Sequence, residues 1–203
     1  MCIRDSINAS LIVGTILLPI YLQNVLGYSA FVTGMVTVPS SVLMAIMSPI
    51  SGMLFDRFGP RGIGILGMSL LTISMIGLAL MGLKTTLVYI IAMMICQALG
   101  LNLANMPINT WGINALDNDY IAHGNAITNT GRQIAGSLST GILITVMTMV
   151  TMANSAAGQV QATLSGIRVA YALAAVLAAA GLLIVILKVR HTQSIAKEIG
   201  MEA

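Results

Sequence analysis

Residues 52–61 read G-M-L-F-D-R-F-G-P-R, and this stretch carries three charged residues in a chain of 203 that has only nine Lys or Arg and six Asp or Glu. It separates two long uncharged runs, 6–55 and 62–83. A bilayer core is crossed by about 20 apolar residues, so each run is long enough to span it. Because charges are costly in hydrocarbon, the stretch is predicted to be a loop at a membrane surface.

The composition of the whole chain is that of a membrane protein. Hydrophobic residues make up 57% and charged residues 7% of the sequence, and the mean hydropathy is +0.95, whereas about a quarter of the residues in soluble domains are charged. No strand-length alternation is visible, so helices are the expected spanning elements. The sequence therefore predicts an all-α membrane protein, a bundle of six transmembrane helices. Their expected ranges are 8–26, 31–55, 62–83, 87–113, 124–152 and 167–189.

The basic residues predict the orientation of this bundle. With the N-terminus in the cytoplasm, two basic residues, Lys84 and Arg168, lie outside. Six lie inside: Arg57, Arg61, Arg132, Lys188, Arg190 and Lys197. This distribution follows the positive-inside rule, so both termini are placed in the cytoplasm. Since the basic residues are scattered among loops, the net charge of +3 indicates no nucleic-acid partner.

The chain is expected to have three parts. Residues 1–6, M-C-I-R-D-S, resemble read-through of a sequencing adapter and are interpreted as a non-native N-terminus; the alternative is a short natural cytoplasmic tail. Residues 7–190 form the six-helix transmembrane bundle. Residues 191–203 are predicted to be a cytoplasmic polar tail.

Amide side chains within the apolar helices are candidates for function, because polar groups are costly at membrane depth. Six of them are interpreted as lining a water-filled cavity: Gln23, Gln97, Asn102, Asn105, Asn129 and Gln133. The alternative is that single amides only hydrogen-bond between helices and hold the bundle together.

Hydroxyl and small residues form two further stripes. Thr33, Thr37 and Ser41 recur every four residues on the second helix. Small residues recur at the same interval from Gly131 to Ser139 on the fifth. Small residues are the usual contacts between membrane helices, so both stripes are interpreted as packing surfaces.

Enzyme and metal sites are not supported by the residue pattern. His123 and Ser137 share a helix and lie about 21 Å apart along it at 1.5 Å per residue, too far for a catalytic pair. No paired carboxylates lie at membrane depth, so no catalytic residue is predicted. The two histidines, His123 and His191, have no cysteine or carboxylate pattern around them, and no metal site is expected.

The spacing G-x-L-x-D-R-x-G-x-R in residues 52–61 resembles motif A of the major facilitator superfamily. The matching positions are Gly52, Leu54, Asp56, Arg57, Gly59 and Arg61. Pro60 departs from the pattern, because the family has a basic residue there. Three further runs, 19–29, 103–111 and 124–141, resemble the QacA/EmrB-type drug:proton antiporters, and most closely their lincomycin-resistance branch.

The resemblance indicates the C-terminal half of such a transporter. The fourth helix lacks the membrane arginine of the N-terminal half, and the chain runs from the sixth helix into a polar tail. In the family, two six-helix bundles rock about a midplane site, which is alternating access. Asp56 would then be a cytoplasmic latch at a helix N-terminus of the other bundle, with Arg57, Arg61 and Arg132 tuning that contact. The alternative is a solvated loop that only fixes topology.

What the resemblance implies is a fragment of a multidrug efflux transporter in a bacterial inner membrane, exporting small amphipathic molecules in exchange for protons. Its partners would be the bilayer, its substrate and the missing N-terminal half. No cofactor is expected, since the proton gradient supplies the energy. The predicted cavity has no carboxylate, so the coupling acid is expected in the missing half and the chain is expected to be inactive alone. Two alternatives are a self-sufficient six-helix unit that dimerises and a non-transporting membrane scaffold.

Overall fold

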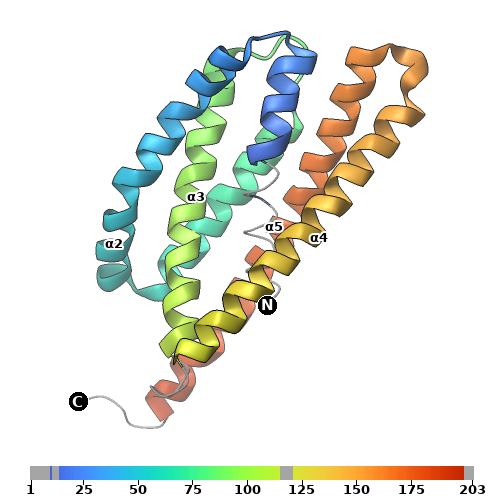
Figure 1. The fold of residues 1–203 in the computed structure, drawn as a ribbon. Coiled ribbons are helices and arrows are strands. Elements are labelled where there is room, and N and C mark those ends of the chain that lie inside the picture. Colours follow the sequence, from blue (N-terminus) through green and yellow to red (C-terminus); the bar gives the residue numbers. More distant parts are fainter. Residues whose placement is uncertain (1–9, 11–13, 115–120, 199–203) are drawn as a thin grey trace.

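The computed structural model describes residues 10, 14–114 and 121–198, with side chains outside 55–61, 106–128, 132, 157 and 187–198. All regular elements within the described residues are helices, which confirms the predicted all-α membrane bundle. A first helix covers 14–20 and continues as the π-helical turn η1 (Tyr21–Val25). The remaining elements are α2 (Ala30–Ala79), α3 (Leu87–Asn114), α4 (Ile121–Ala153), the 3-10 turn η3 (Ser155–Ala157) and α5 (Gln159–Glu198) (Figure 1).

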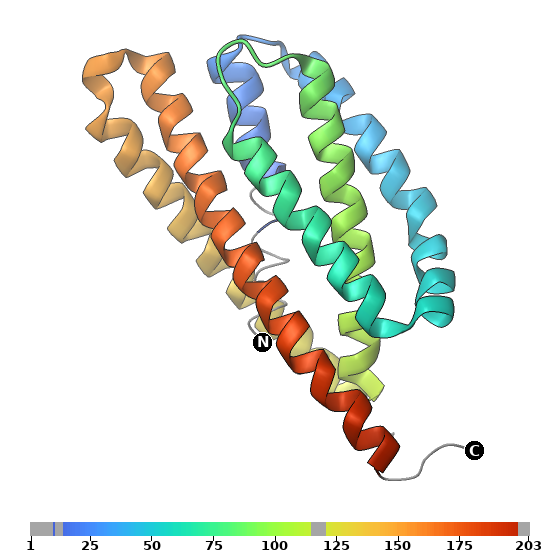
Figure 2. The ribbon, with the colours of Figure 1, turned by 180° about the vertical axis from the view of Figure 1, so that it is seen from behind.

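The long element α2 contains two membrane-length segments, Ala30–Leu54 and Gly62–Ala79. The ribbon folds back on itself between them (Figures 1 and 2). The predicted loop at 52–61 is therefore where the chain reverses, but its backbone is helical rather than an irregular loop. Helical turns satisfy the backbone's own hydrogen bonds, which is advantageous next to a bilayer.

The turn before α2 follows from three residues. Gly27 has a positive φ of 73°, a conformation that residues with a side chain rarely adopt. The Ser29 side chain caps α2 by accepting a hydrogen bond from the Val32 amide at 3.4 Å. The Thr33 hydroxyl donates to the Ser29 carbonyl at 3.1 Å. Together these residues stop the first helix and start α2 beside it.

The core lies where the first helix, the second segment of α2 and α5 meet. Tyr21, Met75 and Tyr171 are fully buried there. α2 packs on both α3 and α5, while α4 packs mainly on α5 and scarcely touches α3 (Figure 2). Two segments have little cover: within a stretch of 18 residues, 17% are buried in Ala30–Leu54 and 11% in Asn129–Ala153, against 56% in Gly62–Ala79.

Three glycines allow helix backbones to touch. A Cβ on Gly67 would lie 2.5 Å from the Ala104 amide nitrogen, and one on Gly100 would lie 2.7 Å from that of Leu71. A Cβ on Gly166 would meet the Met147 carbonyl oxygen at 2.5 Å, which joins α5 to α4. The predicted packing stripe on α4 does not share this feature, since no atom of the described residues lies within 4 Å of a Cβ on Gly131. Small residues permit close packing but do not choose the neighbour.

The last helix begins earlier than the sequence predicts. α5 starts at Gln159, eight residues before the expected start at residue 167. Its first three turns carry Gln161, Ser165 and Arg168, whose polarity shortens the apolar run without ending the helix. Five helical segments of the described residues are long and apolar enough to cross a membrane.

Candidate transport cavity

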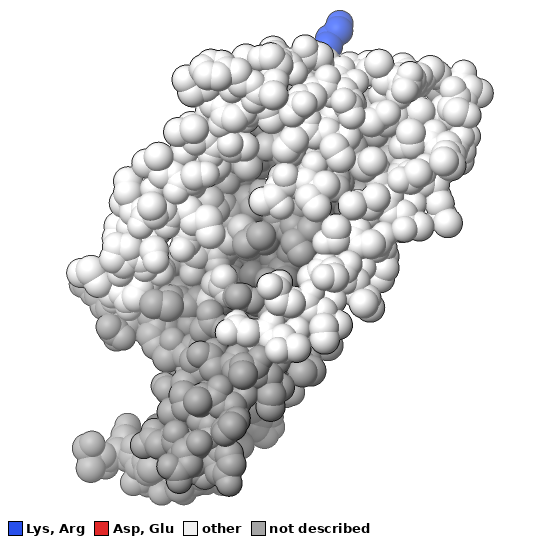
Figure 3. Space-filling model, viewed as in Figure 1, with Lys and Arg blue, Asp and Glu red and all other residues white. Residues whose placement is uncertain are grey.

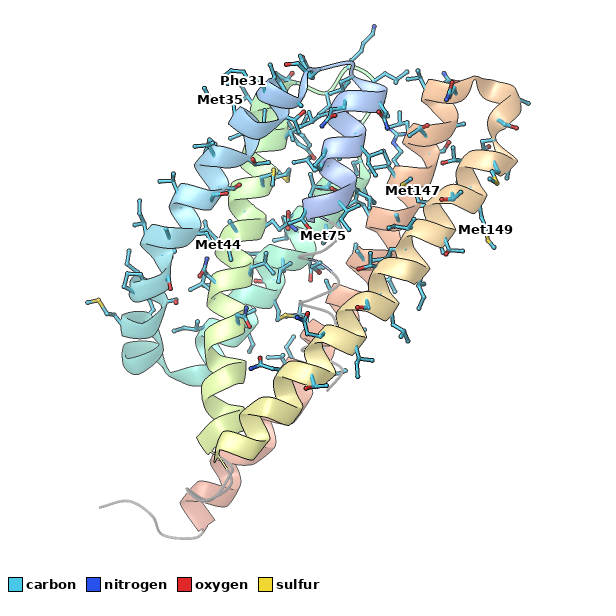
Figure 4. All side chains as sticks on the ribbon, in the orientation of Figure 1. Phe31, Met35, Met44, Met75, Met147 and Met149 are labelled. Carbon is cyan, nitrogen blue, oxygen red and sulfur yellow. The ribbon has the colours of Figure 1, made fainter. Side chains whose placement is uncertain are left out.

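A cavity of about 660 Å³ lies between the first helix, the first segment of α2 and α3. It runs from Gln23 and Ala30, near the turn between the first two helices, to Met44 and Leu101 deeper in the bundle. Met44 lies on the side of α2 that faces α3, whereas Phe31 and Met35 point away from the bundle (Figure 4). One helix therefore presents a cavity face and an outer face.

The described side chains around this cavity carry no formal charge. Its polar side chains are two amides and five hydroxyls: Gln23, Gln97, Thr15, Thr33, Thr37, Ser40 and Ser41. The Thr37 hydroxyl donates to the Gly34 carbonyl at 2.7 Å, and the Ser41 hydroxyl donates to the Thr37 carbonyl at 3.1 Å. Because these protons are used within the helix, the hydroxyl oxygens remain as acceptors.

Gln97 is the buried amide of this site, with 4% of its surface exposed. Its Nε2 donates to the Ser10 carbonyl oxygen at 2.8 Å. A Cβ on Gly14 would collide with the end of the same side chain, so a glycine at this position makes room for the amide. Gln97 therefore lines the cavity and also links α3 to the first helix by a hydrogen bond. Both interpretations of the amides, cavity lining and bonding between helices, apply to this residue.

The structure brings together only part of the predicted amide set. Gln23 and Gln97 line the cavity, while the other four are not among its lining residues. Asn102 is half-buried and donates to the Ala98 carbonyl of its own helix at 3.2 Å. Asn105 is also half-buried, and Asn129 and Gln133 are exposed on α4.

The hydroxyl stripe of α2 belongs to the cavity, which the packing interpretation missed. Thr33, Thr37 and Ser41 line it, and Ser40 joins them one residue off the stripe. Their four-residue spacing shows that they share a face. The spacing alone does not show whether that face meets a helix or an open space.

The gating-motif residues lie at the reversal within α2. Gly52 and Leu54 are half-buried. The side chains of Asp56, Arg57, Gly59 and Arg61, and that of Arg132 on α4, lie outside the described residues. Their predicted role remains a prediction.

Charged side chains within the described part of the chain are two, Lys84 and Arg168. On the face seen in Figure 3, basic atoms project at one place, the upper edge of the molecule, and no acidic atoms are visible among the described residues. No group of three residues able to hold a metal ion is found among the described residues. Among the residues that the structure describes, the lining of the cavity is thus weakly polar and uncharged.

Comparison with known proteins identifies the family. The model of the Major Facilitator Superfamily matches residues 6–140, about two thirds of the chain. The chain belongs to this superfamily. It is thus a multi-pass membrane protein of a transporter family and not an enzyme, as the sequence predicts.

Several relatives are named as transporters or resistance proteins. The MFS-type transporter YcnB of Bacillus subtilis is 38% identical over 176 residues, which cover 86% of this chain and 37% of the relative. The lincomycin resistance protein LmrB of Listeria innocua is 39% identical over 132 residues, 65% of this chain and 28% of the relative. The riboflavin transporter RibZ of Clostridioides difficile is 28% identical over 124 residues, 61% and 27%. The chain spans about a quarter to two-fifths of the length of the curated relatives it matches.

Proposed function

We propose that this chain is the C-terminal six-helix half of a bacterial inner-membrane transporter that exports small amphipathic molecules in exchange for protons. The observation that carries the proposal is the uncharged cavity of about 660 Å³. Met44, Met94 and Leu101 supply apolar surface, and the hydroxyl oxygens of α2 supply acceptors. Such a lining suits a molecule with apolar bulk and a few hydrogen-bond donors. The drug-resistance names among the relatives support efflux as the direction of transport.

A second bundle is needed to complete the transporter. The segments shared with this chain make up 27% and 28% of two of the curated relatives. The two thinly covered segments, Ala30–Leu54 and Asn129–Ala153, supply apolar surface for such a partner and for the bilayer. Alternating access then follows from rocking of the two bundles around a site between them.

Proton coupling is assigned to that second bundle. Exchange with protons requires an ionisable group whose proton affinity responds to the substrate. The described residues around the cavity are all uncharged, so they bind and orient substrate but do not exchange a proton. The energy source is the proton gradient, and no cofactor is required.

The reversal in α2 is assigned the gating role that motif A has in the family. Asp56 would accept hydrogen bonds at the positive N-terminus of a helix in the other bundle and so close the cytoplasmic side. Asp56→Asn in the complete transporter should impair transport without preventing membrane insertion. Normal transport by that variant would contradict the latch role of Asp56 and favour the alternative, a loop that only fixes topology.

The proposal is tested by exchange into a relative. The segment of the Listeria innocua lincomycin resistance protein that aligns with this chain is replaced by the chain itself, and ethidium efflux is measured in a bacterium that lacks its own efflux pumps. The exchanged protein should export ethidium and lose export when the proton gradient is collapsed. The chain expressed alone, at the same level in the membrane, should export none.

Two results would contradict this account. Proton-coupled export by the chain alone would identify a self-sufficient unit that dimerises. An exchanged protein that inserts at normal levels and exports nothing would favour a non-transporting scaffold.

A further inference from the structure

A second cavity, of about 650 Å³, lies at the end of the bundle where α2 connects to α3 and α4 connects to α5. Its lining includes both charged side chains that the structure describes, Lys84 and Arg168. The polar groups around them come from Gly82, Asn154, Gln161 and Ser165. Unlike the transport cavity, this one has positive charge and no acidic residue among its described lining. We propose that it binds the anionic headgroup of a phospholipid.

The α5 side of this cavity follows from helical spacing. Gln161, Ser165 and Arg168 lie at i, i+4 and i+7, so they share one face of the first turns of α5. The same face turns toward the α2–α3 connection, since Arg168 Nε donates to the Met81 carbonyl oxygen. The polar start of α5, which shortened its predicted apolar run, is thus the wall of a site.

The opposite wall is held in place by bonds from other helices. The hydroxyl of Tyr21, a fully buried side chain of the first helix, donates to the Gly82 carbonyl oxygen at 2.6 Å. The Gly82 amide donates to the Thr85 hydroxyl at 2.7 Å. With Arg168 bound to the preceding residue, the backbone beside Lys84 is fixed from two sides. The cavity is therefore a built feature rather than a gap left by a loose loop.

The two cations have donors to spare. The guanidinium of Arg168 has five N–H donors, and its one described hydrogen bond uses only Nε. No partner is found among the described residues for the Lys84 ammonium, which is exposed. The terminal groups of a guanidinium match the oxygens of a phosphate in two-pronged geometry. A lysine binds the same group as a point charge, so one phosphate can satisfy both residues.

The level of Arg168 favours a lipid over a soluble anion. Arg168 follows the first residue of α5 by nine positions, or about 13.5 Å along the helix at 1.5 Å per residue, but its hydrogen bond to Met81 places it level with the α2–α3 connection. A spanning bundle meets the lipid headgroups at such an end, where basic side chains and anionic headgroups attract each other. The exposed side chains nearby in the sequence include the large apolar residues Leu80, Leu83 and Val160, which offer a surface for acyl chains. A phosphodiester headgroup at this level has its tails beside that surface.

The test is lipid binding by the full chain in detergent. Native mass spectrometry measures retention of phosphatidylglycerol, with phosphatidylcholine as the zwitterionic control. The wild-type chain should retain one phosphatidylglycerol in preference to phosphatidylcholine. Lys84→Gln together with Arg168→Gln should weaken that binding by roughly tenfold or more, because each cation near a headgroup contributes to the attraction. Arg168→Lys should keep the charge but weaken binding, because the fork is lost.

Lys188→Gln is the matched control. It also removes one positive charge from α5, but at a position twenty residues after Arg168, toward the C-terminal end of the helix. It should leave the preference for phosphatidylglycerol unchanged. If Arg168→Gln prevents folding, Lys84→Gln alone tests the site, because Lys84 is exposed in a connection between helices. Equal retention of the two lipids, or an equal loss in Lys188→Gln, would overturn the proposal. Displacement of the lipid by millimolar inorganic phosphate would assign the site to a free anion and overturn the lipid assignment.

Discussion

α3 carries two adjoining stripes of residues with contrasting properties. On one, Gly100 and Ala104 touch the backbone of α2 so closely that no side chain fits between the two helices. On the other, Met94, Gln97 and Leu101 line an open cavity. The contact of Gly100 and Ala104 with α2 is a seam that fixes the position of α3. The cavity side of the same helix remains open and can accept a molecule.

The seam should be the part most sensitive to mutation. Gly100→Ala forces its new Cβ against the Leu71 amide nitrogen, so the two helices must separate. Such overpacking typically lowers the free energy of unfolding by about 1–3 kcal/mol. Unfolding in mixed micelles, followed by circular dichroism during titration with sodium dodecyl sulfate, measures this change.

Gly141→Ala is the matched control for the seam. It makes the same chemical change within α4, at a site with no described atom within 4 Å of the new Cβ. Alanine is favoured over glycine inside a helix by up to about 1 kcal/mol, so this variant should be neutral or slightly more stable. Equal destabilisation by both variants would show that the glycines act through the backbone of single helices and not through the seam.

Substitution of Gln97, which lines the cavity and links α3 to the first helix, should have an intermediate effect on the free energy of unfolding. Gln97→Leu removes the hydrogen bond to the Ser10 carbonyl and should lower the free energy of unfolding by about 0.6–1.7 kcal/mol, from the average to the largest value for such bonds between membrane helices. Asn102→Leu removes only a bond within α3 and should cost less, by the same denaturation measurement. A larger loss in Asn102→Leu would contradict the assignment of Gln97 as the link between α3 and the first helix.

The hydroxyl face of the cavity should have the smallest effect on stability. Thr37→Val removes a hydroxyl whose proton is donated within α2, so the free energy of unfolding should change by no more than about 0.5 kcal/mol. In the exchanged transporter the same variant removes an acceptor from the cavity and should weaken ethidium binding, measured by fluorescence anisotropy. If ethidium binding is unchanged and stability falls strongly, the result would contradict the role of Thr37 in the cavity and support a role in helix packing.

The sequence predicts the presence of the helices well, because every span of a bilayer needs a run of about 20 apolar residues. The all-α bundle and its family could be recognised from the charge-free runs and from residues 52–61. Which surfaces meet could not be predicted, since the stripe from Gly131 to Ser139 looks as suitable for packing as Gly67 and Gly100 do. Only the fold brings those two glycines together.

The sequence predicts the type of site, a polar cavity, but not all of the residues that line it. Amides at membrane depth indicate a polar cavity, and Gln23 and Gln97 line one. Thr37 and Ser41 have the same four-residue spacing as residues that pack against a helix. This spacing shows that they share a face of α2 but does not show whether that face meets a helix or a cavity. Arg168 looked like a residue that marks the end of a span, whereas α5 extends nine residues before it and forms a charged cavity there.

The central claim is that the uncharged cavity beside α3 is part of a substrate path, and substrate protection tests it most directly. In the exchanged transporter with Cys2 and Cys96 replaced by serine, a cysteine is introduced by Ser41→Cys in the cavity or by Met149→Cys on the outer surface of α4 (Figure 4). The rate of labelling by N-ethylmaleimide is then measured with and without ethidium. We predict that ethidium slows labelling in the Ser41→Cys variant and leaves the Met149→Cys variant unchanged. Equal rates with and without ethidium in the Ser41→Cys variant would contradict the claim.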